Sequence, residues 1–256
     1  MHSRDYLIGL AIKYLGQWAD IYRAISAKEE PDENEISGYL KLIKCKTITI
    51  LDDDYPDYLK GYYHPPFVLF YYGDISLIKD LNNVIGVVGS REPDPSIVSD
   101  AYQVIYDLAK EYIIISGLAK GIDGLSHKAA IEAGGKTIAV LPNGIEFCYP
   151  AENESLYEEI KRNHLVISEY PFRCPPEREN FHQRNRLIAY LSRALFVPSA
   201  NLKSGTSITV NYAVGYHHNV YCFPSNNIHD SLCNFLIKQW ADLVTEAGDI
   251  IQFEKK

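Results

Sequence analysis

The sequence predicts an α/β fold, namely an extended Rossmann-like, doubly wound and mainly parallel sheet with a small helical domain at its N-terminus. From residue 84 onward, short β-branched and apolar runs alternate with segments of helical periodicity. This alternation is typical of a parallel sheet with helices on both faces. Residues 1–44 show only helical spacing of apolar side chains, and the whole chain of 256 residues is 46% apolar. We therefore expect a helical domain over residues 1–46 and a larger domain with a sizeable core over residues 47–256.

The N-terminal part of the chain is expected to contain two to four short helices, interrupted by an acidic patch at residues 28–35. Residues 47–51 and 67–72 are predicted strands. Between them, Asp52-Asp53-Asp54 is followed by Tyr55-Pro56. Three consecutive carboxylates cannot all point inward from a strand or a helix, so we interpret this segment as a solvated turn and not as a metal site.

The larger domain is predicted to alternate six strands with five helices. The predicted strands are residues 84–89, 112–116, 137–141, 165–168, 194–198 and 219–223. The predicted helices are residues 95–110, 121–133, 154–163, 183–191 and 205–216. In such sheets, ligands bind at the carboxyl ends of the strands, beside the point where the strand order reverses. The residues directly after each strand are therefore the candidates for a binding site.

Composition restricts the environment and the class of ligand. Five scattered cysteines without a Cys-x-x-Cys pair favour a reducing cytosol, and no apolar run reaches membrane-spanning length, so a cytoplasmic protein is expected. The net charge is −8, which argues against a surface coated in basic residues. Residues 171–206, however, carry six basic and two acidic side chains. This imbalance indicates one local anion site.

The first candidate for that site is a glycine-rich bend after the predicted strand at residues 112–116. Gly117, Gly121 and Gly124 precede a helical pattern, so amide N–H groups and the positive helix end would face a ligand there. Lys120 would add a mobile positive charge. The alternative is a tight turn whose glycines only allow helix and strand to pack closely. His127 on that helix could act as a general base or, with no activated nucleophile in the sequence, as a packing and hydrogen-bonding residue.

Three further clusters lie at predicted strand ends or helix starts. Arginine suits phosphate because its planar fork makes two parallel charge-assisted hydrogen bonds. On a helix, Arg184 and Arg186 diverge, so one could face a ligand while the other forms a structural ion pair. Together the clusters predict a ligand that carries phosphate. They are Gly89-Ser90-Arg91, the run from Phe181 through Arg184 to Arg186, and Ser204-Gly205-Thr206.

In combination, order and spacing, these residues resemble the DNA-processing protein A family (DprA, also called Smf), and the similarity covers roughly residues 47–245. The matching blocks are Val87-Val88-Gly89-Ser90-Arg91, Ser116-Gly117-Leu118-Ala119-Lys120-Gly121-Ile122-Asp123 with His127, Tyr149-Pro150 with Asn153, Ser168-Glu169-Tyr170, Arg184-Asn185-Arg186 and Ser204-Gly205-Thr206 with Thr209.

The resemblance implies a homodimer that binds single-stranded DNA in a basic pocket and loads RecA recombinase onto incoming strands during natural transformation. It implies no catalytic activity, cofactor or metal. Phe181 could stack on a base, or it could be a packing residue. By position, the expected DNA-binding residues are Ser90, Arg91, Ser116, Gly117, Lys120, Asn153, Phe181, Arg184, Arg186, Ser204, Gly205 and Thr206.

The chain departs from the family pattern at three places. The proline usual before Arg184-Asn185-Arg186 is replaced, because the local sequence is Phe181-His182-Gln183. Ala151 stands where the family usually has lysine after Tyr-Pro, so we expect one phosphate contact to be lost. Pro224-Ser225 replaces Pro-Gly after the last predicted strand. If the dimer and RecA surfaces lie in this C-terminal part, the resemblance does not specify their residues. The alternative is a nucleotide-binding Rossmann-like sensor or a phosphoribohydrolase-type enzyme, although no carboxylate lies between Thr206 and Val214 to act as its acid or base.

Overall fold

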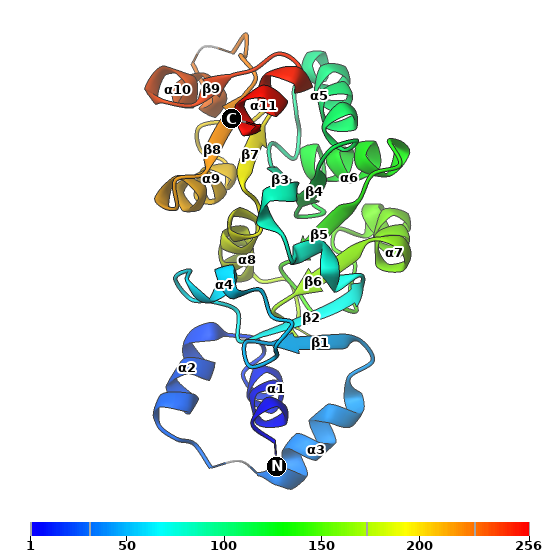
Figure 1. The fold of residues 1–256 in the computed structure, drawn as a ribbon, viewed down its shortest axis with the longest axis vertical. Helices are drawn as coiled ribbons and strands as arrows, with labels where there is room; N and C mark the ends of the chain where they lie inside the picture. Colours follow the sequence, from blue (N-terminus) through cyan, green and yellow to red (C-terminus); the bar gives the residue numbers. More distant parts are fainter. Residues whose placement is uncertain (1, 31, 173, 228, 256) are drawn as a thin grey trace.

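The computed structural model describes residues 2–30, 32–172, 174–227 and 229–255, and a long twisted sheet runs through most of the molecule (Figure 1). The sheet order is β1-β2-β6-β5-β4-β3-β7-β8-β9. β2 pairs antiparallel with β1 and β6, and the other neighbours pair in parallel. The mainly parallel sheet that the sequence predicted is therefore confirmed. Its strands are β1 (Lys46–Thr49), β2 (Val68–Gly73), β3 (Val84–Val87), β4 (Ile113–Ser116), β5 (Thr137–Leu141), β6 (Leu165–Ser168), β7 (Ala194–Val197), β8 (Asn219–Cys222) and β9 (Asp242–Leu243).

The chain winds away from β3 in both directions. Helices α5 (Pro95–Leu108), α6 (Ile122–Glu132) and α7 (Glu154–Asn163) connect β3, β4, β5 and β6 in turn. The chain then returns through α8 (Arg178–Tyr190) to β7, on the other side of β3, and continues through α9 (Thr206–Gly215) to β8. Because parallel crossovers are right-handed, reversing the direction of winding places α8 and α9 on the opposite face from α5 and α6. The reversal lies between β3 and β7.

Side chains of the central strands alternate between two cores. Leu195 and Val197 of β7 pack in the core that contains α8, α9 and α10 (Leu232–Gln239). Phe196, between them in sequence, packs in the core that contains α5, α6 and α11 (Ala247–Glu254). This period of two is the signature of a strand covered on both faces.

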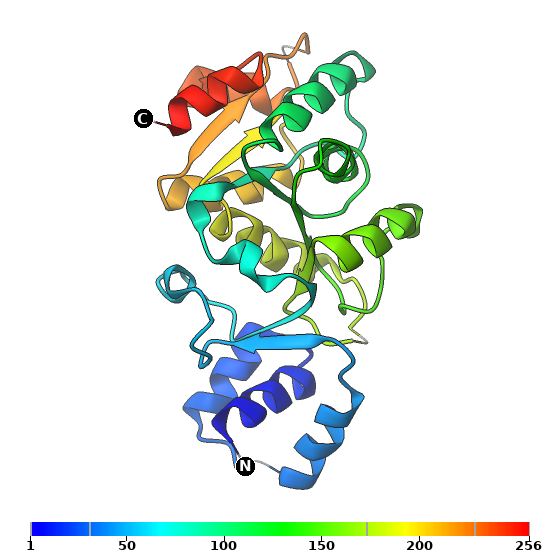
Figure 2. The same ribbon diagram turned by 45° about the vertical axis from the view of Figure 1, so that its right-hand side comes forward.

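The N-terminal helices cluster at one end of the molecule, below β1 in Figures 1 and 2. They are α1 (Ser3–Lys13), α2 (Trp18–Ser26) and α3 (Glu33–Leu42). Buried side chains of α1 and α2 share a core with β2, β5, β6 and α7. The chain enters the sheet directly after α3, at Lys46. The division into two domains after residue 46 stays a prediction.

The structure differs from the sequence-based prediction in several elements. Helix α8 begins at Arg178 and not at residue 183, because its first turn is polar and carries no apolar stripe to mark it. The C-terminal helices α10 and α11 and the short strand β9 were not predicted. Within the described residues, no helix is both long and apolar enough to cross a membrane.

Candidate functional site

A cavity of about 730 Å³ opens at the carboxyl ends of β3 and β7, where the strand order reverses. Parallel sheets of this winding bind ligands at such a reversal. The residues after β3, the start of α8 and the start of α9 meet there. The lining residues are Val88, Gly89, Ser90, Arg91, Glu92, Ala119, Asp123, Tyr149, Arg178, Phe181, His182, Arg184, Asn185, Ile188, Asn201, Ser204, Gly205, Thr206 and Thr209.

Ser90 and Arg91 lie in the loop after β3, which two backbone hydrogen bonds hold in place. The Ser90 N–H donates to the Ser199 carbonyl at 2.7 Å, and the Ser90 carbonyl accepts from the Ile122 N–H at 3.0 Å. Gly121 has a positive φ of 71°, and a Cβ there would overlap the Ser90 carbonyl oxygen. The glycine therefore permits the start of α6 to pack against this loop. Arg91 is exposed at the rim of the cavity.

Two guanidinium groups lie close to the ring of Phe181. The Cζ of Arg91 is 5.3 Å from the ring centroid and the Cζ of Arg184 is 5.9 Å from it, both within the range of cation–π attraction. Tyr149 meets the same ring edge-on at 5.8 Å. Phe181 is partly buried, so this aromatic surface contributes to the cavity wall instead of lying in the core.

Arg184 is buried and holds the ends of two strands together. Its Nη1 donates to the carbonyls of Gly117, at 2.5 Å, and Val140, at 2.6 Å. Burial lowers the pKa of Arg184 to about 10, against the opposing effect of Asp123, so the guanidinium stays charged at neutral pH. Burial also raises the pKa of Asp123. Arg184 thus provides the cavity with a fixed positive charge.

Ser204, Gly205 and Thr206 form the wall where α9 begins. The N-terminal amide groups of this helix and its dipole favour an anion there. Asn185, in the middle of α8, donates to the Gly205 carbonyl at 3.3 Å, which joins α8 to the start of α9. The Ser204 hydroxyl oxygen is buried and has no hydrogen-bond partner among the described residues. It is therefore free to bind a ligand oxygen.

A smaller cavity of about 50 Å³ shares four residues with the main one and adds Gly117 and Lys120. Lys120 forms an ion pair with Glu152. Both side chains are more than half exposed, and Lys120 lines the smaller cavity together with Arg91. The positive charge of Lys120 is thus present at the site, but the Glu152 carboxylate partly neutralises it.

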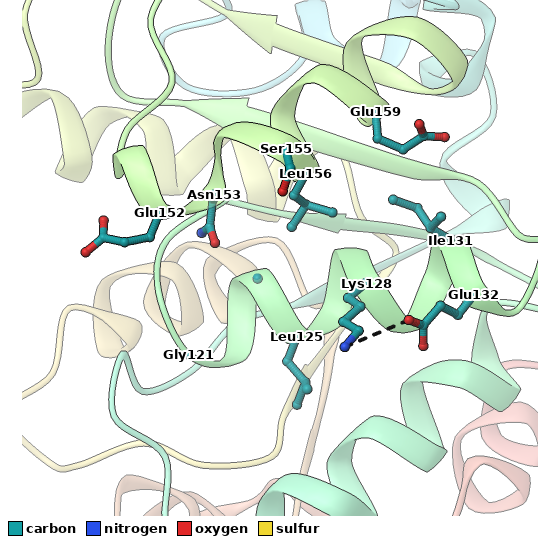
Figure 3. A pocket seen from close by; sticks show the side chains of 11 residues that line it. Gly121, Leu125, Lys128, Ile131, Glu132, Glu152, Asn153, Ser155, Leu156 and Glu159 are labelled. Carbon is teal, nitrogen blue, oxygen red and sulfur yellow. Dashed lines mark ion pairs between the residues drawn. The ribbon is translucent and has the colours of Figure 1, made fainter.

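Asn153 supports the loop instead of lining either cavity. Its side-chain amide donates to the carbonyls of Leu118, at 2.9 Å, and Ala119, at 3.1 Å. Leu118 has a positive φ of 59°, a conformation that these hydrogen bonds help to hold. Asn153 lines a separate groove between α6 and α7, shown in Figure 3. Asn153 thus does not line the cavity at the ends of β3 and β7, and its expected part in DNA binding stays a prediction.

Two other expected site residues are buried away from the cavity. Ser116 is fully buried and donates to the Val87 carbonyl at 2.6 Å, because it is the last residue of a central strand. Arg186 is 1% exposed and forms two hydrogen bonds with Glu169, at 2.6 and 2.7 Å. Of the two arginines that diverge on α8, Arg184 faces the cavity and Arg186 forms the structural ion pair. Neither Ser116, which was expected to line the pocket, nor Arg186, which was expected around it, lines the cavity, and their part in DNA binding stays a prediction.

His127 is likewise buried, with its Nδ1 2.7 Å from the Thr137 hydroxyl oxygen. Burial lowers its pKa to about 3. Of the two roles that the sequence left open, this position fits packing and hydrogen bonding. His127 does not line the cavity.

Several lining residues were not among the candidates from sequence. Tyr149 and Asp123 belong to the blocks that the sequence comparison singled out, and Arg178 and His182 flank Phe181. Only the true start of α8, which the helical pattern missed, places Arg178 and His182 on the cavity. Within the described residues, no cluster of three or more His, Cys, Asp or Glu side chains could hold a metal ion.

The fold and the cavity define a class, namely a doubly wound Rossmann-like protein with a cavity lined by basic and aromatic side chains at its strand-order reversal. Within that class the chain belongs to the DprA/Smf family, because residues 46–255 match the family model for DNA recombination-mediator protein A.

Relatives and solved structures agree with this assignment. The chain is 40% identical to DNA processing protein DprA of Streptococcus pneumoniae over 215 residues, which is 82% of this chain and 75% of that one. It is 37% identical to DNA processing protein DprA of Bacillus subtilis over 214 residues, 80% of this chain and 70% of that one.

The X-ray structure of DNA processing protein A from S. pneumoniae superimposes with a TM-score of 0.83 at 33% identity, covering 98% of both chains. A structure of DNA processing protein A from Helicobacter pylori, which describes the single-stranded DNA binding mode of that protein, superimposes with a TM-score of 0.74 at 27% identity. It covers 82% of this chain and 96% of that one.

Proposed function

We propose that this chain binds single-stranded DNA in the cavity between the ends of β3 and β7 and loads RecA recombinase onto it. The observation that carries the proposal is the pairing of Arg91 with Phe181. An exposed guanidinium lies 5.3 Å from an aromatic ring, at the mouth of a cavity of about 730 Å³. Charge for phosphate and a flat apolar surface for a base are the two components of single-strand recognition.

The remaining wall suits a phosphodiester backbone. Arg91 can bind one phosphate through two parallel hydrogen bonds. A second phosphate can bind to the amide groups at the start of α9 and to the free Ser204 hydroxyl. Contacts of this kind are indifferent to base sequence, and their strength falls as salt rises. The single-strand binding of the H. pylori relative supports the same ligand class here.

The proposal includes a homodimer in the cytoplasm and assigns no bond-making or bond-breaking step to the cavity. The five cysteines are free thiols, which suits a reducing compartment. Membership of a recombination-mediator family supports RecA as the protein partner in natural transformation and recombination. Light scattering tests the dimer, and the RecA ATPase on DNA covered with single-strand binding protein tests loading.

The test of DNA binding is a titration of fluorescent oligo-dT across a salt series with the wild type and Arg91→Ala. Removing one phosphate contact should weaken binding strongly at low salt and reduce the slope of log K against log salt by about 0.7. Arg162→Ala is the matched control, because Arg162 is an exposed arginine of α7 that does not line the cavity. Phe181→Ala should weaken binding by about 1–3 kcal/mol if the ring stacks on a base.

Two results would overturn the proposal. A folded wild type that does not bind oligo-dT at low salt has no single-strand site. If the same protein binds nucleoside monophosphates, the alternative of a nucleotide-binding sensor or phosphoribohydrolase-type enzyme replaces DNA binding. Equal losses in Arg91→Ala and Arg162→Ala would mean that only overall charge matters and that the cavity is not the site.

A further inference from the structure

A stack of four aromatic rings, formed by Tyr22, Trp18, His64 and Tyr63, lies outside the cavity. We infer that this aromatic ladder binds the bases of single-stranded DNA where the strand leaves the cavity, an inference that rests on the proposed function. It assigns a role to α2 and to the loop after α4 (Asp57–Lys60), neither of which contributes to the cavity.

These four rings stack in one continuous order, and Trp18 also stacks on Phe67, at 5.2 Å and 18°. The Tyr22 and Trp18 centroids are 5.0 Å apart with an interplanar angle of 10°, because residues four apart lie on the same face of α2. Trp18 and His64 are 3.8 Å apart at 22°, and His64 and Tyr63 are 3.7 Å apart at 24°. His64 has a positive φ of 55°, a conformation uncommon outside glycine, and its ring stacks with both Trp18 and Tyr63.

The two end rings of the ladder are open to solvent. Tyr22 is 53% exposed and Tyr63 is 65% exposed, whereas Trp18 and His64 between them are partly buried. A protein rarely leaves large aromatic rings exposed and aligned unless a partner covers them. A flat π surface stacks on any base without sequence preference. This agrees with the proposed cavity contacts, which are made to the DNA backbone and do not depend on base sequence.

The ladder runs alongside the helix that carries the cavity's aromatic residue. Gln17, next to Trp18, donates to the Asn180 side chain at 3.1 Å, and Asn180 precedes Phe181. At the other end, the Tyr63 carbonyl accepts from the Tyr190 hydroxyl at 3.0 Å, near the end of α8. In Figure 1, α2, α4 and α8 lie along the same side of the molecule. A strand leaving Phe181 along α8 therefore passes the ladder.

Charges near the ladder cancel instead of attracting phosphate. Arg23 pairs with Asp20 at 2.8 Å in α2, and Lys60 pairs with Asp57 at 2.9 Å in α4. His64 is neutral at pH 7, since burial and the nearby Arg186 lower its pKa. The ladder should therefore add affinity by stacking and not by releasing counterions, so its contribution should depend little on salt.

The test compares Tyr63→Ala with Tyr63→Phe on two lengths of oligo-dT. A short oligomer of about 6 nucleotides fills only the cavity, and a long one of about 20 nucleotides also reaches the ladder. Tyr63→Ala should bind the long oligomer about tenfold more weakly, keep its affinity for the short one and keep the salt slope of the wild type. Tyr63→Phe, which keeps the ring, should behave as the wild type. Tyr22→Ala should repeat the loss.

Each other outcome overturns the inference in a distinct way. An unchanged affinity of Tyr63→Ala for the long oligomer means that no base stacks there. Equal losses for both lengths mean that Tyr63 acts through the position of α8. If the wild type binds neither oligomer, the proposed function itself fails, and the ladder proposal fails with it.

A second measurement needs no variant. A long oligomer carrying 5-iodo-deoxyuridine is irradiated on the wild type, and the cross-linked peptides are identified by mass spectrometry. Cross-links at Tyr22 or Tyr63 are expected. Cross-links confined to Phe181 and Tyr149 would show that the strand does not pass the ladder.

Discussion

The Arg186 guanidinium donates two hydrogen bonds to the Glu169 carboxylate, at 2.6 and 2.7 Å, and both side chains are buried. Glu169 directly follows β6 and Arg186 lies in α8. The pair therefore joins the last strand of the first winding to the helix that carries the chain back across the sheet. It sets the position of α8, from which Phe181 and Arg184 reach the cavity. Its contribution to binding is thus indirect.

Removing one member of this pair should destabilise the fold. Arg186→Met leaves a buried carboxylate without its partner, which costs about 3–5 kcal/mol, measured by urea unfolding. Replacing both residues, as Arg186→Met with Glu169→Leu, should cost less than Arg186→Met alone because no buried charge remains unpaired. Unchanged stability together with lost DNA affinity in Arg186→Met would instead identify Arg186 as a DNA ligand.

Gly121 and Gly134 allow a comparison of two glycines that share a positive φ. Both have positive φ, 71° and 73°, but a Cβ at Gly134 would meet open space. Gly134→Ala should therefore cost about 1–2 kcal/mol for the left-handed backbone alone. Gly121→Ala should cost more and should also weaken oligo-dT binding, since its methyl group displaces the loop of Ser90 and Arg91. The prediction fails if the two variants unfold at the same urea concentration and bind DNA equally.

Glu152 should limit the affinity for DNA by holding Lys120. The Lys120 ammonium holds the pKa of Glu152 below its ordinary value, so the carboxylate is charged and competes with a phosphate. Glu152→Gln should raise oligo-dT affinity roughly two- to fivefold, the range expected for one exposed pair. Glu154→Gln, at an exposed carboxylate two residues along, controls for net charge. An equal gain in both variants would show that Lys120 is not specifically released.

The buried His127 should make the fold sensitive to acid. Burial lowers its pKa in the folded chain to about 3 from 6.5, and His164 and Arg184 nearby act in the same direction. Below pH 6.5 the unfolded chain gains a proton that the folded chain does not, so this residue's contribution to stability is lost as the pH falls towards 3.

The expected loss from His127 is at most about 1.4 kcal/mol per pH unit. His127→Gln removes that contribution, so the difference in unfolding free energy between pH 7 and pH 5 should shrink relative to wild type. Urea unfolding at the two pH values measures it. If the difference does not shrink, the acid sensitivity belongs to other groups, of which the buried His164 is one.

Much of the fold was predictable because local patterns are strong where strands are buried on both faces. The predicted bounds of β5 (Thr137–Leu141), β6 (Leu165–Ser168) and α7 (Glu154–Asn163) match the structure. The start of α8 and the C-terminal elements were missed, since the first turn of α8 is polar and β9 has only two residues. Such elements depend on tertiary packing against the sheet and neighbouring helices, and not on a local sequence pattern.

By itself, the sequence determined the class of fold and the chemistry of the site. Apolar periodicity specifies the alternation of strands and helices, and glycines and arginines after strands indicate an anion site. Only the tertiary structure decided which polar residues face the ligand. Arg184 and Arg186 are two positions apart, yet one lines the cavity and the other is buried against Glu169. A helix turns about 200° over two residues, so which of them meets the cavity depends on how α8 packs against the sheet.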